Sequence, residues 1–293
     1  MKEYDLMIIG PATRDVNIDY TGEESRIVGG AVTFCTASAM AAGAKVFALV
    51  KADPAEKDVM EVFRMPEEDK ALAPSPCTTL MRNQYHTPDR DRREVHCDAQ
   101  SSGFQIGEVP PVRRKLTHLA GLCYGDYPDE FIEALHSQGP LAADIQGFLR
   151  HIVDTNAVFR DWDQKLRFLP YFRYLKTDTA EAEILTGLTD RREAARQLYD
   201  WGARETLISN AEEMLVYDGE KIYTCPVRAR NLSGRTGRGD TVFAAYIARR
   251  TLGDDIPTAL LYATACVSLK METPGVFRGS YEDVEAYIHD FYS

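Results

Sequence analysis

The chain has 293 residues, 44% of them hydrophobic and 27% charged, with a formal net charge of −11 at pH 7. This length and apolar content allow a sizeable core in one large domain or two small ones, and the composition does not indicate disorder. The acidic balance argues against nucleic acid and anionic membranes as partners, although backbone amides at a helix start can still hold the phosphates of a nucleotide.

The first half of the chain combines short apolar runs with one polar segment. Residues 6–9 predict a buried strand, and the charged residues before them form neither a secretion signal nor a membrane span, so we expect a cytoplasmic protein. Residues 31–42 predict a helix of small residues, and residues 45–50 predict a strand. Residues 78–99 form two polar stretches joined by a turn at 87–89, which predicts a hairpin with an exposed face.

The second half of the chain alternates strand and helix patterns. The expected strands span residues 117–122, 141–145, 174–176, 206–209, 214–217 and 222–225. The expected helices span residues 129–136, 179–185 and 190–201, with a further helix starting near Pro257. Repeated strand–helix units predict an α/β fold with a mainly parallel sheet, formed by one domain over residues 1–293. The polar hairpin does not fit inside this layer, so we expect it to project as a small β lid.

Residues 233–240, Ser-Gly-Arg-Thr-Gly-Arg-Gly-Asp, carry the chemistry-bearing pattern and precede an apolar helix. The three glycines let the backbone approach a ligand closely, and the helix points its free N–H groups and positive dipole end into the loop. This pattern is typical of a phosphate cradle. Asp240 could accept a proton from a substrate hydroxyl there, or it could simply cap the helix, and the octet alone leaves the two about even. The glycine spacing matches neither a Walker A loop nor a Rossmann fingerprint.

Three segments together resemble a known family. Residues 236–243, Thr-Gly-Arg-Gly-Asp-Thr-Val-Phe, are similar to the C-terminal signature of the PfkB, or ribokinase-like, carbohydrate kinases. Gly29-Gly30 with the following small-residue helix resembles the N-terminal signature, and residues 176–187 resemble the Asn-x-x-Glu stretch of the family. The segments occur in family order across essentially the whole chain. Residues 143–148 and the -Gly-Arg-Thr-Gly-Arg-Gly-Asp- loop also look like the myo-inositol kinase-like branch.

The resemblance implies a ribokinase-like three-layer fold, with a central, mainly parallel sheet and lid segments at roughly 12–28 and 78–106. It implies transfer of the γ-phosphoryl group of ATP, with Mg²⁺, to a hydroxyl of a small polyol or sugar. Myo-inositol or a related cyclitol is the first candidate for the acceptor. Because the lid often mediates dimer formation in the family, a homodimer is a further expectation.

The resemblance also implies roles for particular residues. Asp240 is the expected base, and the backbone of Gly237, Arg238 and Gly239 completes an anion hole with it. The expected acceptor-binding residues are Asp15, Gly29, Gly30, Asn83 and Asp144. The expected donor-binding residues are Lys176, Asp178, Glu181, Ser209, Thr236 and Gly275, of which Glu181 would act near the Mg²⁺–phosphate assembly. Without the family, Asp15 reads as a turn residue, Asp144 as a surface carboxylate and Glu181 as a solvated helix position.

Several positions depart from the family pattern. Phe34 stands where many members have a substrate-binding Asn, and Gly234 stands where an Asp often helps to hold a monovalent cation, which leaves potassium activation open. Asp178 replaces an Asn, residues 209–211 replace a Thr-x-Gly beside the nucleotide, and Arg238 replaces a small residue. These departures keep two alternatives in view. One is a ligand-binding or regulatory protein that has lost catalysis, and the other is a nucleoside or sugar-acid kinase.

Overall fold

A nine-stranded sheet forms the centre of the protein. The computed structural model describes residues 2–87 and 93–292. The strands of this sheet are β1 (Glu3–Pro11), β4 (Val46–Ala52), β5 (Lys70–Pro74), β8 (Arg113–Leu119), β9 (Leu141–Asp144), β12 (Phe172–Asp178), β13 (Glu205–Ser209), β14 (Glu213–Tyr217) and β15 (Ile222–Pro226). Their order is β15-β14-β13-β12-β9-β8-β1-β4-β5. All pairs from β13 to β5 are parallel, and β14 and β15 add an antiparallel edge, so the predicted mainly parallel sheet is confirmed.

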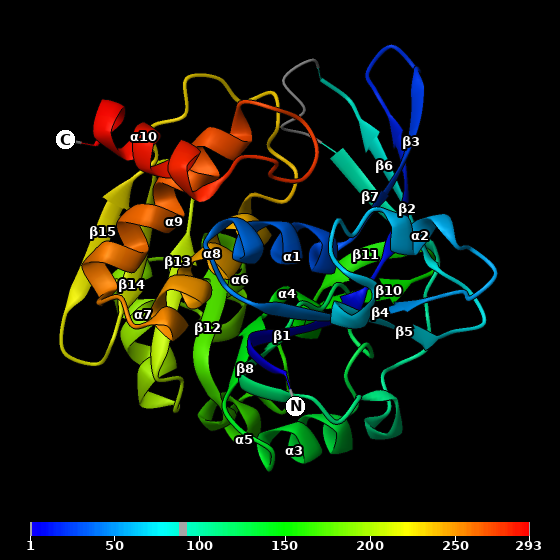
Figure 1. Ribbon diagram of the computed structural model, residues 1–293, viewed down its shortest axis with the longest axis horizontal. Helices are drawn as coiled ribbons and strands as arrows, with labels where there is room; N and C mark the ends of the chain where they lie inside the picture. The colour runs from blue at the N-terminus through cyan, green and yellow to red at the C-terminus, as the bar shows by residue number, and fades with distance from the viewer. Residues whose placement is uncertain (1, 88–92, 293) are drawn as a thin grey trace.

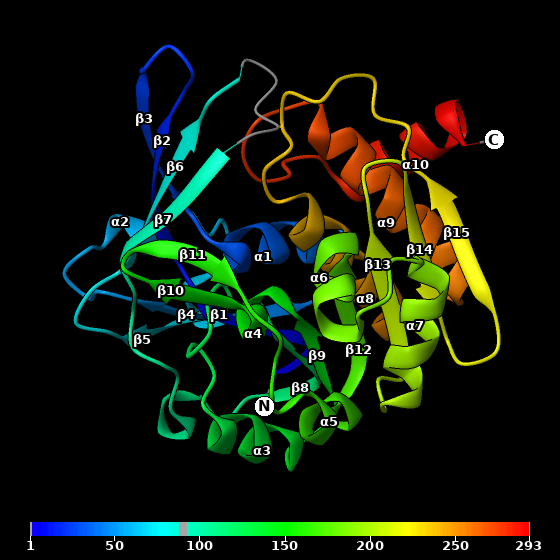
Figure 2. The same ribbon diagram turned by 180° about the vertical axis from the view of Figure 1, so that it is seen from behind.

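Helices cover both faces of this sheet (Figures 1 and 2). One face carries α1 (Ala31–Ala41), α8 (Arg238–Leu252), α9 (Ile256–Met271) and α10 (Tyr281–Phe291). The other carries α3 (Asp129–His136), α4 (Gln146–Leu149), α5 (Lys165–Phe168), α6 (Thr179–Thr186) and α7 (Arg191–Asp200). Successive side chains of a strand point to opposite faces, so Leu6 and Ile8 of β1 join the core under α8 and α9, whereas Met7 and Ile9 join the core under α3. Burial on both faces explains why β1 reads as a continuous apolar run.

The remaining short elements lie in the connections between strands and helices. They are α2 (Asp58–Glu61), η1 (Glu67–Asp69), η2 (Ile106–Glu108) and η3 (Leu169–Tyr171). Among the described residues, none of the helices combines the length and the apolar character that crossing a lipid bilayer requires.

A second, six-stranded sheet lies against one end of the first and forms the lid. Its strands are β2 (Thr13–Ile18), β3 (Glu24–Gly29), β6 (Thr79–Tyr85), β7 (Arg93–Ala99), β10 (Arg150–Val153) and β11 (Asn156–Phe159), in the order β10-β11-β7-β6-β2-β3. The strands β2, β3 and β6 project beyond the body of the molecule (Figure 1). The predicted hairpin is present as β6 and β7, and part of its turn lies outside the described residues. The β10–β11 hairpin was not predicted.

Local caps set the helices that lead into the site. The Asp190 side chain accepts hydrogen bonds from two backbone N–H groups at the start of α7, as expected for its position. Gly187 ends α6 in the left-handed region, with φ 73°. The predicted helix at Pro257 is α9, in which this proline occupies the first turn.

A buried ion pair ties α8 to the sheet. Glu205 of β13 is 8% exposed, and its carboxylate accepts two hydrogen bonds of 2.9 Å from the guanidinium group of Arg250. It also accepts a hydrogen bond from the hydroxyl group of Tyr246. Such a carboxylate holds two partners that would otherwise be left unpaired in a largely apolar setting.

We therefore predict that Glu205→Ala lowers the free energy of unfolding by about 2–3 kcal/mol, because it strands one buried charge and one buried hydroxyl. Urea denaturation followed by circular dichroism measures this change. Glu212→Ala changes an exposed residue directly before β14 and is the control. It should shift the free energy of unfolding by no more than about 0.5 kcal/mol. Equal effects from the two variants would contradict the prediction.

Candidate active site

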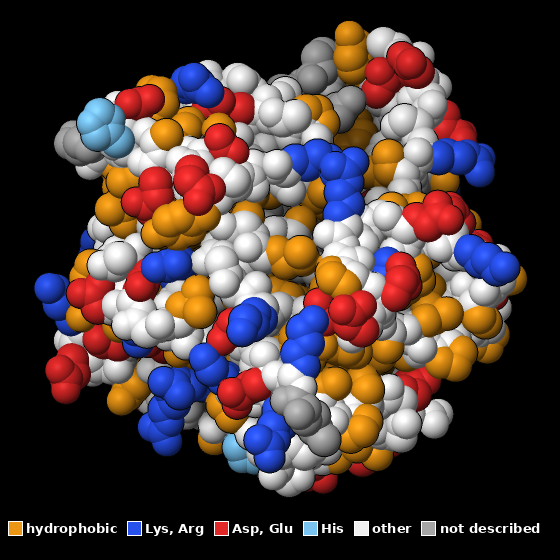
Figure 3. Space-filling model, in the orientation of Figure 1, with side chains coloured by type: hydrophobic (Ala, Val, Ile, Leu, Met, Phe, Trp, Pro, Cys, Tyr) orange, Lys and Arg blue, Asp and Glu red, His pale blue; other side chains and the backbone are white. Residues whose placement is uncertain are grey.

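A cavity of about 750 Å³ lies between the lid, the start of α8 and the carboxyl ends of the central strands. The strands β9, β12 and β13 end there at Asp144, Asp178 and Ser209, all of which line it. Parallel strands present their carboxyl ends at one edge of a sheet, which is where α/β proteins place ligand sites. In the space-filling view, Lys and Arg side chains gather beside the hollow between the lid and the body (Figure 3).

The start of α8 forms one wall of the cavity. Gly237 precedes the helix with φ 77°, and a Cβ atom there would lie 2.2 Å from Cδ1 of Phe34. Only a glycine can combine this left-handed conformation with such a close approach to the ring. The N–H group of Arg238 donates a 3.3 Å hydrogen bond to the carbonyl of Arg235, whereas those of Gly239 and Asp240 face no preceding turn of α8 and lie at its positive dipole end. This is the backbone for which the loop sequence predicts an anion hole.

Asp240 occupies the first turn of α8 and lines the cavity. Burial, together with Asp144, raises the pKa of this carboxyl to about 6, against the lowering effects of Lys176, Arg150 and Lys270. A carboxylate with a pKa near 6 is ionised at neutral pH and still basic enough to accept a hydroxyl proton. Asp240 thus faces the cavity, and among the described residues its side chain makes no capping hydrogen bond at the start of α8.

Lys176 lies directly against the anion hole. A Cβ atom at Gly239 would lie 2.9 Å from its Nζ atom, so this glycine is what admits the ammonium group. The Nζ atom is 2.9 Å from Oδ2 of Asp144 and 3.5 Å from Oε2 of Glu181. Burial works against the charged form of Lys176, but the two carboxylates outweigh it and raise the pKa of the ammonium group. A fixed positive charge therefore stands beside the backbone that would hold a phosphate.

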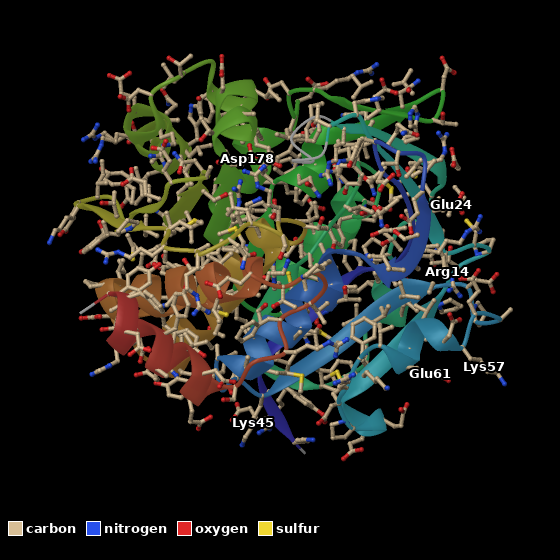
Figure 4. All side chains as sticks on the ribbon, turned by 90° about the horizontal axis from the view of Figure 1, so that it is seen from above. Arg14, Glu24, Lys45, Lys57, Glu61 and Asp178 are labelled. Atoms are coloured by element: carbon tan, nitrogen blue, oxygen red, sulfur yellow. The ribbon has the colours of Figure 1, made fainter. Side chains whose placement is uncertain are left out.

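Both carboxylates of this cluster are buried, at 4% exposure for Asp144 and 3% for Glu181. The surface interpretations of these two residues are therefore wrong. Asp178 and Glu181 form a capping box at the start of α6, in which each side chain accepts from the other's backbone N–H group, at 2.8 and 2.7 Å. Burial raises the pKa of Glu181 to about 7 against the lowering effect of Lys176. Figure 4 shows Asp178 well inside the outline of the molecule.

The lid supplies the opposite wall of the cavity. Asp15 on β2 points inward, whereas its neighbour Arg14 points outward and pairs with Glu56 and Asp58, near the rim of the view in Figure 4. Burial raises the pKa of Asp15, against the lowering effects of Thr13, Arg93 and Arg150. Alternation along a strand explains this division of neighbouring side chains between the two faces.

Two further polar groups and a set of apolar side chains complete this wall. Asn83 on β6 lines the cavity and donates a 3.1 Å hydrogen bond to Asn17. Arg150 at the start of β10 is 7% exposed, and its buried Nε atom has no hydrogen-bond partner among the described residues. The apolar lining includes Phe34, Met81, Tyr85, Val95 and Leu122. This mixture suits a small polar molecule with an apolar ring face.

The predicted residues that line the cavity are Asp15, Gly30, Asn83, Asp144, Lys176, Asp178, Ser209, Glu181, Thr236, Gly237, Arg238, Gly239 and Asp240. Gly29 and Gly275 do not line it. Gly29 packs behind Asp15, where a Cβ atom would lie 2.6 Å from the carboxylate, and Gly275 follows the lining residue Pro274. Sequence reasoning missed Arg150, because no pattern in the sequence distinguishes a buried arginine from an exposed one.

Carboxylates at the donor end can take part in holding Mg²⁺. Asp178 and Glu181 both line the cavity, and Mg²⁺ in phosphate-transfer sites commonly uses one or two carboxylates together with substrate phosphates and water. No group of three or more His, Cys, Asp or Glu side chains among residues 2–87 and 93–292 is arranged to hold a metal on its own. The donor set therefore fits an ion that arrives with the phosphate and is not held by the protein alone.

A glycine-rich helix start, a partly buried carboxylate beside it and a lid over the cavity are the arrangement expected of an enzyme of phosphoryl transfer to small molecules. Residues 112–282 match the model of the pfkB family carbohydrate kinases. The chain belongs to this family and is a carbohydrate kinase, so the predicted family and enzyme class are confirmed.

Individual relatives refine this assignment. The chain is similar to a pyrophosphate-dependent kinase in the ribokinase family complexed with a pyrophosphate analogue and myo-inositol, at 31% identity and a TM-score of 0.87, covering 96% of this chain and 99% of that one. It is 25% identical to a cytidine kinase of Thermococcus kodakarensis over 85% of this chain and 89% of the relative. The ribokinase of Arabidopsis thaliana, complexed with ribose and ATP, has a TM-score of 0.76 over 98% of this chain and 99% of that one, but only 15% identity. The ribokinase-like fold is thereby confirmed.

The contact between Gly237 and Phe34 generates a test of the anion-hole geometry. We predict that Gly237→Ala lowers the free energy of unfolding by about 3 kcal/mol, from the left-handed backbone and from the clash with the ring. In a Phe34→Ala background the clash is absent, so the same change should cost about 1–2 kcal/mol less. A double-mutant cycle in urea measures this difference.

Gly187→Ala is the matched control for that cycle. Gly187 has nearly the same φ, 73°, but a Cβ atom there meets no heavy atom within 4 Å. Its cost should be the same with and without the Phe34 ring. Additive behaviour at both glycines would show that the ring does not constrain the start of α8.

Proposed function

We propose that the protein phosphorylates a hydroxyl group of a cyclitol, with myo-inositol as the leading acceptor and Asp240 as the catalytic base. The observation that carries this proposal is the position of Asp240, a carboxylate with a pKa of about 6 in the first turn of α8, beside the anion hole. The acceptor hydroxyl gives its proton to this carboxylate as its oxygen attacks the terminal phosphorus atom. The bond from that phosphorus to the bridging oxygen breaks, and the leaving phosphate keeps the electron pair.

The acceptor is assigned to the lid side of the cavity. Asp15 and Asn83 offer polar groups to ring hydroxyls there, and Phe34 and Met81 offer an apolar surface. The relative whose structure contains myo-inositol shares 31% of its residues with this chain, which supports a cyclitol over a furanose. Phe34 in place of the usual Asn points in the same direction.

The donor is assigned to the side of the cavity lined by Lys176, Arg235 and Arg238. The family resemblance favours ATP, whereas the relatives at 30–32% identity are pyrophosphate-dependent. Three cationic side chains beside one anion hole suit a compact donor that brings concentrated negative charge and no nucleoside. We therefore place pyrophosphate before ATP as the donor. When bound, Mg²⁺ would neutralise part of the phosphate charge, with Asp178 and Glu181 as its protein contacts.

Cytidine is the second candidate for the acceptor. The relative from Thermococcus kodakarensis is named a cytidine kinase, and a pyrimidine ring could pack against Tyr85, Val95 and Leu122. A ligand-binding protein without catalysis is disfavoured, because binding alone gives no reason to bury a carboxylate with a raised pKa beside an anion hole.

The first test is a matrix of donors and acceptors. Pyrophosphate, ATP and GTP are each combined with myo-inositol, other inositols, ribose, fructose, a sugar acid and cytidine, and the phosphorylated product is detected by ³¹P NMR. We expect turnover of myo-inositol with pyrophosphate and a far lower kcat/KM with ATP. Turnover of cytidine alone would replace the proposed acceptor, and binding of the acceptors without any product would favour the non-catalytic alternative.

The second test addresses Asp240. Asp240→Asn should lower kcat by about 10²–10⁴-fold while acceptor binding, measured by calorimetry, persists, because the amide cannot accept the proton. In the wild type the base works only as the carboxylate, so kcat/KM should fall about tenfold per pH unit below pH 6 and reach a plateau between about pH 6.5 and 7.5. Asp200→Asn, at an exposed helix end outside the cavity, is the control. A rate of Asp240→Asn close to that of the wild type would remove Asp240 as the base.

A further inference from the structure

Lys270 is a buried lysine whose place in the reaction does not follow from the family motifs. It lies in the last turn of α9, is 2% exposed and does not line the cavity. Its Nζ atom donates hydrogen bonds to the backbone oxygens of Gly234, at 2.5 Å, and Thr236. The same ammonium group lies 5.2 Å from the centre of the Phe34 ring, within the range of a cation–π contact.

The groups that contact this ammonium group are all uncharged. Among the described residues no carboxylate lies within 4.0 Å of its Nζ atom, so two carbonyl dipoles and an aromatic face take the place of an ion pair. A buried charge is expensive unless such groups replace its water, and buried carbonyls are likewise expensive without a donor. The ammonium group and the two carbonyl groups therefore satisfy each other, and either would be left unpaired without its partner.

The hydrogen bonds act on the loop that precedes the anion hole. A trans peptide unit is planar and points its C=O and N–H bonds in opposite directions. Binding the Thr236 carbonyl to Lys270 therefore turns the N–H bond of Gly237 away from Lys270, on the side opposite to the ammonium group. Gly237 lines the cavity, so the orientation of this peptide unit determines how an anion-hole group is presented to a phosphate.

The rest of the loop is also fixed to the end of α9. The backbone N–H group of Gly234 donates to the carbonyl of Met271 at 2.7 Å, and the hydroxyl group of Ser233 donates to the carbonyl of Glu272 at 2.8 Å. A Cβ atom at Gly234 would lie 2.0 Å from the carbonyl oxygen of Thr273, so the loop approaches α9 too closely for any side chain. These contacts hold the start of the loop, and Lys270 holds the peptide unit that leads into α8.

We propose that Lys270 is a positioning residue for phosphoryl transfer, a cation built into the chain that binds the carbonyls of Gly234 and Thr236 and thereby orients the anion hole. The proposal rests on the kinase function proposed above. It also implies that the enzyme needs no added monovalent cation for this purpose, because the ammonium group already occupies the carbonyls that such an ion would bind.

The charge of Lys270 is open to titration. Burial lowers the pKa of its ammonium group to about 8, and Asp240 on α8 acts in the opposite direction. Further charged side chains on the packed segments are Arg235 in the loop, Arg238 in the first turn of α8, and Glu272 after α9, which pairs with Arg230. The ammonium form is present below pH 8 and is lost as the pH rises through 8, so the tether should weaken on the alkaline side.

Chemical rescue is the decisive experiment. Lys270→Met keeps the apolar stem without the charge, and Lys270→Ala also opens the space of the side chain. Both should lower kcat by about 10²-fold with little change in the KM of the acceptor, as expected when the anion hole is misaligned. Methylammonium, ammonium or potassium ions should raise the kcat of Lys270→Ala at least about tenfold. The same ions should raise the kcat of Lys270→Met less and leave the kcat of the wild type unchanged.

Hydrogen exchange measured by mass spectrometry tests the tether without relying on turnover. In Lys270→Met the amides of residues 234–240 should exchange about tenfold faster than in the wild type. The control is Lys51→Met, because Lys51 is equally buried, at 1% exposure, and bonds to Glu108 at 2.6 and 2.7 Å outside the cavity. It should loosen residues near 108 and leave the loop protected. Absence of kinase turnover in the wild type would defeat the proposed function, but this measurement would still decide on the tether.

The wild-type protein provides a test of the tether that does not depend on whether a variant folds. Between pH 7 and 9.5, kcat should fall and exchange of the loop, corrected for its intrinsic pH dependence, should rise around pH 8. A flat profile for both quantities would overturn the proposal. So would Lys270→Met with kcat within about threefold of the wild type, or a lost activity that no cation restores in a protein whose loop remains protected.

Discussion

The buried ammonium group of Lys176 is the interaction on which the site depends. It joins the ends of two neighbouring strands, because Lys176 of β12 lies beside Asp144 of β9 in the sheet register. It also reaches Glu181 at the start of α6 and touches the backbone at Gly239 of α8. Four elements from three separate parts of the sequence, β9, β12 with the following α6, and α8, thus meet around one charge. A charge buried in this way is stable only with its partners in place, so the cluster specifies how sheet and helices meet.

The same charge distribution sets the pKa of Asp240, the proposed base. Desolvation and the neighbouring Asp144 raise this pKa, while Lys176 and Lys270 limit the rise. Loss of the two lysines would raise the pKa further, and full exposure would bring it down toward the ordinary value of an aspartate. The value near 6 is therefore a balance between opposing effects, set by residues on three different segments.

Much of the fold could be predicted from the sequence, because its elements follow local rules. Apolar runs predicted the central strands, and Asp190 and Gly187 predicted helix ends from their capping chemistry. The β10–β11 hairpin escaped prediction for an equally local reason. Its turn uses Asp154 and Thr155, with φ of 48° and 69°, where a glycine would have signalled a two-residue turn. A threonine in the left-handed region is uncommon and gives no sequence signal.

The site could be predicted only as far as its residues lie in recognisable motifs. The glycines and Asp240 form such a motif, but whether Asp240 is a cap or a base depends on burial, which the octet does not encode. The contacts of Lys270 likewise could not be predicted from its local sequence. A lysine in the last turn of a helix normally reads as an exposed residue that complements the helix dipole. Its role arises from the loop that folds against it, 34 residues away in sequence.

The contacts of Phe34 give a structural reason for its departure from the family pattern. Its ring lies against Gly237, where no side chain would fit, and against the ammonium group of Lys270. It also lines the cavity. An asparagine there would offer hydrogen bonds to a ligand, whereas the ring covers the lysine from the cavity side and packs on the turn that begins α8. Under the proposed function, Phe34 therefore exchanges one polar contact to the acceptor for support of the backbone that would bind the donor phosphate.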